Sequence, residues 1–212
     1  MLQISTFVFN SFGVNTYLLF DETCECLIID PACQHPHEEQ ELSGFIEKNG
    51  LKPVRMINTH AHIDHILGNT FVGRKYNLKP EAHRAGIKFF EIAPSSGSVF
   101  GISVGKVDIP ADFLDEGDVV KFGNSSLNIL YTPGHADGSI CLVDDLNGFV
   151  ITGDVLFQES IGRTDLPTGN LDTLLNSIRL KLFTLPDHFV VYPGHGPTTT
   201  IGFEKRNNPF IS

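Results

Sequence analysis

Short apolar runs separated by turn-forming residues dominate the first thirty positions of the chain. Three such runs, Leu2–Phe9, Val14–Phe20 and Glu25–Asp30, are separated by Asn10–Gly13 and Asp21–Thr23. Apolar runs of this length, bounded by Asn, Asp, Gly and Thr, are typical of β-strands joined by tight turns. The pattern therefore predicts three consecutive strands at the start of the chain.

The apolar spacing then changes from the strand period to the helical period. Leu42, Phe45 and Ile46 lie at helical spacing and predict a helix. The compact apolar run Val54–Thr59 predicts a strand, and Ile66–Tyr76 predicts a second helix. The first half of the chain thus has the order strands, helix, strand, helix.

The second half begins with residues 94–110, which are rich in Pro, Ser and Gly and which we expect to form a functional loop. Strands are then expected at Val119–Phe122, Leu127–Tyr131, Ser139–Asp144 and Gly148–Thr152. Asn170 is a candidate cap for an amphipathic helix, and Phe189–Tyr192 predicts a last strand. This order of elements indicates a mixed α/β protein.

Length and composition fit one globular domain over residues 1–212. The formal net charge of -10 argues against nucleic acid as the default partner, because phosphate binding needs a basic face. The first basic residue is Lys48, so we expect no signal peptide, and no apolar run is long enough to cross a bilayer. We therefore expect a cytoplasmic protein that acts on a small molecule, with homo-oligomerisation left open. The four cysteines are expected to be reduced structural thiols: Cys24, Cys26, Cys33 and Cys141.

Side chains able to bind metals follow four of the predicted strands, each at a turn or sharp loop. They are His60, His62, Asp64, His65, His135, Asp154 and His195. Functional sites gather at such strand ends because the sheet holds the loops rigidly. Imidazole and carboxylate ligands suit Zn, Fe and Mn, and this many of them suit two ions, which can hold a bridging hydroxide as a nucleophile. The sequence therefore predicts a two-metal hydrolytic site.

The remaining histidines do not follow this pattern. His35 and His37 flank Pro36 ahead of a predicted helix, His83 lies in a helical stretch, and His188 follows Asp187. Each is expected to be solvated or structural.

The run from Thr59 to His65, which reads Thr-His-Ala-His-Ile-Asp-His, is followed at long spacings by Gly134-His135, Gly153-Asp154 and Gly194-His195. This set resembles the metallo-β-lactamase superfamily over essentially the whole chain. The resemblance implies a four-layer αββα sandwich, two mixed sheets flanked by helices, with the metals at one edge of the sheets.

The resemblance also implies a division of the ligands. His60, His62 and His135 would hold one ion, whereas Asp64, His65 and His195 would hold the other. Asp154 would bridge them, and Asp64 could also orient the nucleophile or carry its proton. An Asp at position 64 points toward hydrolases of thioesters and phosphodiesters, and away from the antibiotic-degrading subclass that has one Cys ligand.

Within the superfamily, the segment Ser160–Asp165 and the tail Ile201–Phe210 resemble short bacterial hydrolases similar to hydroxyacylglutathione hydrolase, which splits S-D-lactoylglutathione. In that group a basic residue matching Arg163 contacts the glutathione part of the substrate. A surface salt bridge is the alternative role for Arg163. Seventeen residues follow His195, too few for the helical domain that completes the glutathione site in longer members.

The resemblance therefore favours a metal-dependent thioester hydrolase with two divalent ions, zinc first and iron or manganese as alternatives. Persulfide dioxygenases, which use one iron held by residues matching His60, His135 and Asp154, share the motif and form the main alternative. A binding protein with a spent metal site is a weaker one, because all seven ligand positions are filled. RNA-processing nucleases of the superfamily add recognition elements for which this short acidic chain has little room.

Overall fold

Two six-stranded mixed sheets face each other in the part of the chain that a computed structural model describes, residues 1–99, 101–102 and 104–211. The first sheet contains, in spatial order, β1 (Gln3–Phe9), β2 (Val14–Phe20), β3 (Glu25–Ile29), β4 (Lys52–Ile57), β5 (Pro80–Ala82) and β6 (Asp112–Phe113). The second contains, in spatial order, β14 (Thr199–Thr200), β13 (Val190–Pro193), β10 (Phe149–Gly153), β9 (Ile140–Asp144), β8 (Ser125–Tyr131) and β7 (Val119–Phe122). A small ribbon consists of β11 (Leu156–Phe157) and β12 (Ser160–Ile161).

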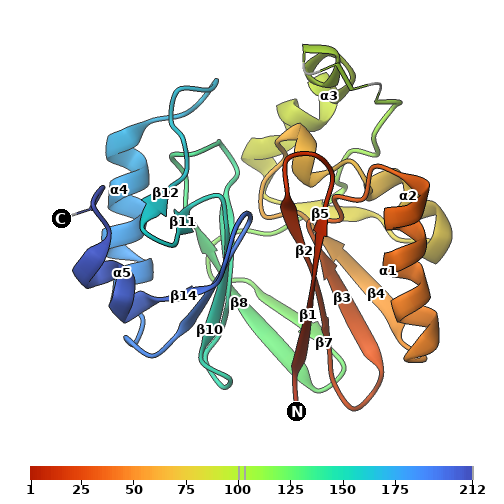
Figure 1. Cartoon of the computed structure of the whole chain (residues 1–212), viewed down its shortest axis with the longest axis horizontal. Helices are drawn as coiled ribbons and strands as arrows, with labels where there is room; N and C mark the ends of the chain where they lie inside the picture. Colours follow the sequence, from red (N-terminus) through yellow and green to blue (C-terminus); the bar gives the residue numbers. More distant parts are fainter. Residues whose placement is uncertain (100, 103, 212) are drawn as a thin grey trace.

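Helices cover the outer face of each sheet (Figure 1). On the first sheet lie α1 (Pro36–Lys48) and α2 (Asn69–Tyr76), and on the second lie α4 (Leu171–Leu180) and α5 (Ile201–Asn207). The longest remaining helix is α3 (Ile87–Val99), and three short 3₁₀ helices are η1 (Ile63–His65), η2 (Arg84–Gly86) and η3 (Leu182–Thr184). The arrangement is helix, sheet, sheet, helix, so the expected αββα sandwich is confirmed.

The apolar pattern of the strands follows from which faces are buried. Tyr17 and Leu19 of β2 pack in the core between the two sheets, whereas Leu18, which points the other way, packs in the core under α1 and α2. Both faces of β2 are therefore buried, which explains its unbroken apolar run. In β8 only one face is covered, so buried Leu127 and Ile129 alternate with exposed positions.

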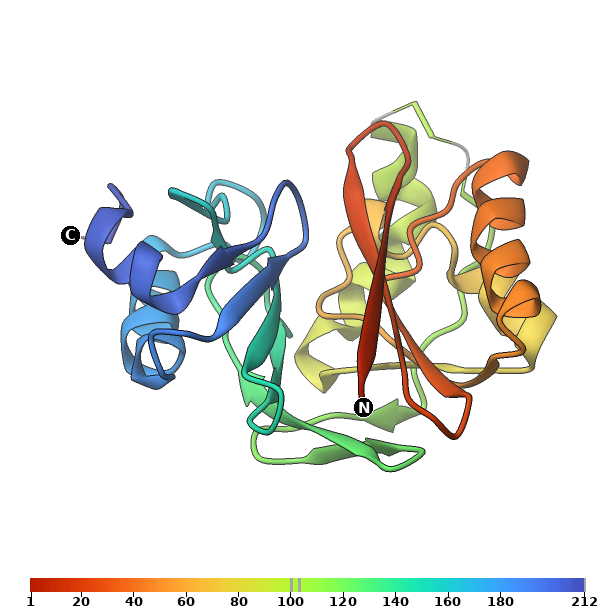
Figure 2. The ribbon, with the colours of Figure 1, turned by 60° about the horizontal axis from the view of Figure 1, so that its bottom comes forward.

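The second view shows how the sheets meet at their lower ends (Figure 2). The hairpin that joins β7 to β8 reaches the turn after β2, where the backbone amide of Asn124 donates to the Asp21 carboxylate at 2.7 Å. Near the opposite end of β2, Val14 forms an isolated antiparallel bridge with His195. The two sheets are thus tied together at both ends of β2.

Several predicted elements differ from the structure. The helix expected from Ile66 begins at Asn69, because η1 and a turn intervene. Residues 94–110 were expected to be a loop, but α3 extends through Pro94 to Val99, held by the buried side chains of Phe89 and Phe90. Phe100 and Ser103, which fall in this expected loop, lie outside the described residues.

Two smaller expectations can be compared directly. His83 was predicted to lie in a helical stretch, but it lies directly before η2, where its ring accepts from the amide of Ala85. The cysteines are all free thiols, as expected. No helix within the described residues is long and apolar enough to cross a membrane. That residues 1–212 form one domain stays a prediction.

Candidate metal centre

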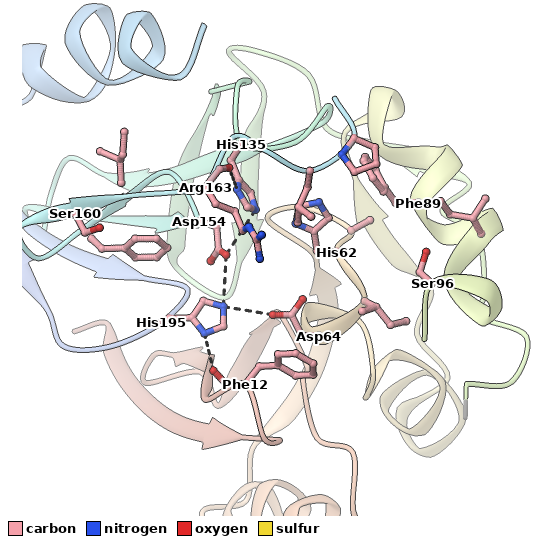
Figure 3. Close-up of a pocket in the computed structure, with 17 residues that line it drawn as sticks. Phe12, His62, Asp64, Phe89, Ser96, His135, Asp154, Ser160, Arg163 and His195 are labelled. Atoms are coloured by element: carbon pink, nitrogen blue, oxygen red, sulfur yellow. Dashed lines mark hydrogen bonds and ion pairs between the residues drawn. The ribbon is translucent and has the colours of Figure 1, made fainter. Parts of the chain in front are cut away.

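Four strand ends meet at one edge of the sandwich, and the side chains that follow them converge there. Figure 3 shows five of these side chains around the cavity: His62, Asp64, His135, Asp154 and His195. The segment after β4 contributes four of these side chains, and the turns after β8, β10 and β13 contribute one each. In this order they are His60, His62, Asp64 and His65, then His135, Asp154 and His195.

The coordinating atoms of these side chains converge. Among the described residues, three sets have all their ligand atoms within 4.8 Å of one another: His60, His62 and His135; His60, His65 and Asp154; and Asp64, His65 and His195. The Nε2 atom of His195 lies 3.4 Å from an oxygen of both Asp64 and Asp154. All seven side chains singled out in the sequence therefore meet in one cluster, and their role as ligands stays a prediction.

Several atoms of this cluster are buried without a hydrogen-bond partner. These are Nε2 of His60, His62 and His135 and Oδ1 of Asp154. Buried polar atoms in native proteins are almost always paired, because an unpaired one loses its hydration without compensation. Divalent cations bound at the cluster would satisfy these atoms, so the residues present fit a metal site.

Two of the imidazole rings are oriented by backbone carbonyl groups. His135 Nδ1 lies 2.8 Å from the carbonyl oxygen of Arg163, and His195 Nδ1 lies 3.1 Å from that of Phe12. A carbonyl oxygen only accepts, so each Nδ1 carries a proton, and Nε2 is the atom of each ring at which a cation would bind. Neither contact could be predicted from the sequence, because any residue type provides a carbonyl.

A buried carboxylate orients a third ring. The carboxylate of Asp30 lies 3.0 Å from His65 Nδ1 and accepts from the backbone amide of Thr59 at 2.7 Å and from its hydroxyl at 2.6 Å. Asp30 thus connects the end of β3 to the segment that carries four candidate ligands. Asp30 was predicted only as the last residue of a strand, although its place at the end of an apolar run is a signal that it shares with the candidate ligands.

Close packing fixes the turn that carries His195. A Cβ atom on Gly194 would lie 2.2 Å from Oδ1 of Asp154, so only glycine allows the turn to approach the cluster this closely. The Asn15 side chain and the Tyr17 hydroxyl both donate to the carbonyl of Pro193, at 2.9 and 2.6 Å. The turn is therefore held by β2 of the opposite sheet.

Burial and neighbouring charges set the protonation of the cluster. Burial, with the neighbouring His65, holds the pKa of His60 well below its usual value, and burial lowers the pKa of His62 to about 4. Burial would raise the pKa of Asp154, but the positive charge of His65 and the hydrogen bond from His195 hold it well below its usual range. At neutral pH these groups are therefore in the forms that bind cations.

Two rings behave differently, because carboxylates face them. Burial would lower the pKa of His65, but Asp154 and Asp64 raise it well above its usual value. Burial opposes the charge of His195 as well, yet hydrogen bonds to Asp154 and Asp64 raise its pKa to about 9. The cluster thus places positive charge beside its two carboxylates, which bound cations would also do.

A cavity of about 490 Å³ opens onto the cluster. Much of its wall is apolar and comes from Phe12, Ile63, Phe89, Ile92, Phe157 and Ile161. Ser96 and Ser160 contribute hydroxyl groups. From the stretch 94–110, which was expected to form a functional loop, Ser96 lines the cavity as part of α3. An apolar wall with a few polar groups is typical of a small-molecule site.

Arg163 lines the same cavity. Its side chain also forms a two-pronged ion pair with Asp165, with Nε–Oδ1 at 2.7 Å and Nη2–Oδ2 at 2.6 Å. Both roles considered for Arg163, a place at the substrate site and an exposed salt bridge, are therefore compatible with its position.

Comparison with known proteins agrees with this geometry. Residues 10–195 match the family model of the metallo-beta-lactamase superfamily. The chain belongs to the metallo-beta-lactamase superfamily. It is therefore a metallohydrolase of a superfamily that binds metal ions, and its His and Asp clusters are suited to that role.

Curated members of the superfamily are similar over nearly their whole length. The probable metallo-hydrolase YqgX of Bacillus subtilis is 40% identical over 199 residues, which cover 93% of this chain and 92% of YqgX. The hydroxyacylglutathione hydrolase GloC of Haemophilus influenzae is 35% identical over 213 residues, which cover 100% of this chain and 99% of GloC.

Solved structures of the superfamily share the fold. The BLEG-1 B3 metallo-beta-lactamase has a TM-score of 0.90 at 30% identity, covering 99% of this chain and 100% of BLEG-1. TTHA1623, solved in a di-iron-bound form, has a TM-score of 0.86 at 32% identity, covering 98% and 99%. ETHE1 from Myxococcus xanthus has a TM-score of 0.78 at 30% identity, covering 98% of this chain and 83% of ETHE1.

Proposed function

We propose that this chain is a two-metal hydrolase of acyl thioesters, the class to which S-D-lactoylglutathione belongs. The observation that carries the proposal is the set of buried, unpartnered ligand atoms of His60, His62, His135 and Asp154 beside a largely apolar cavity. The similarity to hydroxyacylglutathione hydrolase GloC over the whole chain supports this substrate class.

His60, His62 and His135 would hold one ion, and Asp64, His65 and His195 the other, with Asp154 between them. This division is supported by two of the three sets of converging ligand atoms. Two zinc ions, our first choice, would polarise the thioester carbonyl and lower the pKa of a bound water to about 7. Iron is the alternative, motivated by the di-iron form of TTHA1623.

The residues of the chain then have separate tasks. Burial would raise the pKa of Asp64, but His65 and His195 hold it below its usual value, so its carboxylate is ionised at neutral pH. Asp64 takes the proton of the attacking water and returns it to the sulfur as the C–S bond breaks. The water oxygen forms the new C–O bond, and the products are a carboxylic acid and a thiol.

The wall of the cavity positions the substrate. Phe12, Phe89 and Ile161 hold the apolar parts of the acyl group and the thiol carrier, and exclude bulk water from the reacting carbon. Exclusion of water strengthens the electrostatic interactions within the site.

The decisive experiment combines metal analysis with a substrate panel. We expect about two metal ions per chain and turnover of S-D-lactoylglutathione, with no oxygen uptake on a glutathione persulfide and no hydrolysis of a cephalosporin. His135→Ala and Asp154→Ala should lose bound metal and turnover together. His188→Ala, at an exposed histidine outside the cluster, is the matched control and should keep both.

Other outcomes would replace the proposal. One iron per chain with oxygen uptake on the persulfide would indicate a dioxygenase. Cephalosporin hydrolysis without thioester turnover would align the chain with the BLEG-1 lactamase. Full thioester turnover by a metal-free His135→Ala protein would refute the metal chemistry altogether.

A further inference from the structure

The guanidinium group of Arg163, which lines the cavity, is already paired with a carboxylate of the chain itself. Arg163 binds both oxygens of Asp165 through two of its nitrogens. We propose that Asp165 occupies, in the free protein, the place of a carboxylate on the substrate, and that an anionic substrate displaces it. This inference rests on the proposed thioester hydrolysis and narrows its substrates to thioesters of thiols that carry a carboxylate.

The backbone of Arg163 is held by the candidate metal centre, whereas its side chain is exposed. The carbonyl of Arg163 accepts from His135, so the backbone at this position belongs to the support of the candidate metal centre. The side chains of Arg163 and Asp165, in contrast, are 58% and 66% exposed. Figure 3 shows the Arg163 side chain among the candidate ligands around the cavity. The guanidinium group can therefore exchange one carboxylate for another without moving the ligands.

Apart from the candidate metal centre and its histidines, the cavity has, in its described part, one cationic side chain suited to bind a carboxylate. Among the described residues that line it, Arg163 is the only Lys or Arg. The planar guanidinium binds one carboxylate in a two-pronged geometry, so Asp165 and a substrate carboxylate compete for the same fork. Exposed ion pairs are weak, and displacement of Asp165 should lower the affinity for an anionic substrate by only about two- to fivefold.

A role for Asp165 in orienting Arg163 predicts the opposite effect on anion binding. If Asp165 held Arg163 in its binding position, removing the carboxylate would weaken anion binding, because the fork would no longer be oriented. If Asp165 competes, removing the carboxylate strengthens anion binding. The sign of the effect therefore separates the two roles.

The test uses two substrates that differ only in charge, the S-lactoyl thioesters of 3-mercaptopropionate and of 3-mercaptopropanamide. Asp165→Asn should lower KM for the carboxylate substrate about two- to fivefold, and leave KM for the amide and kcat for both unchanged. In Arg163→Gln the advantage of the carboxylate substrate should disappear, and adding Asp165→Asn to that variant should have no further effect. Asp115→Asn is the matched control, because Asp115 forms a similar two-pronged pair with Arg84 but does not line the cavity.

Three results would overturn the inference: a higher KM for the carboxylate substrate in Asp165→Asn, an equal change in KM for both substrates, or a lower KM that persists without Arg163.

Failure of the proposed hydrolysis is recognised by a separate binding experiment. The corresponding propyl thioethers have no carbonyl to cleave, and calorimetric titration of the metal-loaded protein with them measures binding alone. If neither protein cleaved a thioester but Asp165→Asn bound the thioether carboxylate about two- to fivefold more tightly than the wild type, the proposed hydrolysis would be refuted and the competition by Asp165 would be supported.

Discussion

At the scale of single residues, the candidate centre depends on partners that do not touch the metal positions. The rings of His65, His135 and His195 are each oriented through Nδ1, by Asp30 or by a backbone carbonyl. Such partners fix the tautomer and the direction of the ring, so that Nε2 points into the cluster. Of these partners, Asp30 acts through its side chain and can be tested by substitution.

We predict that Asp30→Asn weakens metal binding about 10- to 100-fold and destabilises the fold by about 1–3 kcal/mol. The amide group would turn a donor toward Thr59 or His65, where the structure needs acceptors. Competition with a chromogenic chelator would measure the affinity, and urea unfolding the stability.

A matched control for Asp30 is available elsewhere in the fold. Asp144 is also buried and accepts three hydrogen bonds, from Leu146 and Asn147, in a turn at the other end of β9 from the cluster. Asp144→Asn should destabilise the fold without weakening metal binding. Equal losses of metal affinity in the two variants would show that Asp30 has no specific effect on His65.

The candidate ligands were visible in the sequence because their residue types and their positions after strands both mark them. The partners of these ligands were not visible for a physical reason. The carbonyls of Phe12 and Arg163 act through the backbone, which every residue has, and only the folded geometry shows which carbonyl meets which ring. The ion pair between Arg163 and Asp165 was not specified either, although both residues stood in the motif.

At the scale of elements, the C-terminal segment supports one wall of the cavity. Glu204 of α5 is buried and accepts from the Thr199 hydroxyl at 2.6 Å, the Glu159 amide at 2.9 Å and the Asn208 side chain at 2.8 Å. Asn208 also donates to the carbonyl of Ser160 at 3.0 Å. These contacts hold the ribbon of β11 and β12, which contributes Phe157 and other residues to the cavity. The tail motif thus has a structural explanation.

We predict that Glu204→Ala raises KM about three- to tenfold while kcat changes less than about twofold, because the variant loosens a wall of the cavity and no candidate ligand. Stability should fall by about 1–3 kcal/mol, since buried donors lose their acceptor. Steady-state kinetics would test this. Glu204→Gln keeps one acceptor oxygen, so its KM should lie between those of the wild type and Glu204→Ala.

The control for general destabilisation is Ile178→Val in the core under α4, expected to cost about 1 kcal/mol and to leave KM unchanged. If kcat fell as steeply as KM rose in Glu204→Ala, the ribbon would affect the ligands themselves and not only the wall.

Elements with a clear apolar pattern were predictable, whereas the shortest strands and α3 were not. Strands such as β2 and β8 have clear apolar runs or alternation, which local sequence records. β5, β6 and β14 are only two or three residues long, and pairing with their neighbours, not local pattern, makes them strands. α3 was missed because Pro, Ser and Gly suggest a loop, whereas the burial of Phe89 and Phe90 against the segment after β4 stabilises a helix.

At the scale of the whole molecule, the two sheets are joined at opposite ends of β2. At one end the turn carrying His195 bonds to Asn15. At the other end Asp21 is buried and accepts from Thr23 at 3.0 Å within its own turn, and from the Asn124 amide at 2.7 Å and the Ser125 hydroxyl at 2.8 Å across the sheets. The second junction contains no candidate ligand, so its contribution to folding can be measured apart from metal binding.

We predict that this junction makes stability depend on pH in an acidic window. Burial would raise the pKa of Asp21, but hydrogen bonds from Thr23, Ser125 and Asn124 lower it from 3.8 to about 2. Because the pKa is lower in the folded state, the contribution of Asp21 to stability is complete above about pH 4 and is lost as the pH falls through about 2. Asp21→Asn should cost about 1–3 kcal/mol at pH 7, and the difference from the wild type should shrink below pH 4. Urea unfolding of the metal-free proteins between pH 7 and pH 3 would measure this difference in stability.

Ser125→Ala, which removes one cross-sheet donor, should show a smaller difference from the wild type over the same range. If the difference for Asp21→Asn stayed constant down to pH 3, the charge of Asp21 would not hold the sheets together.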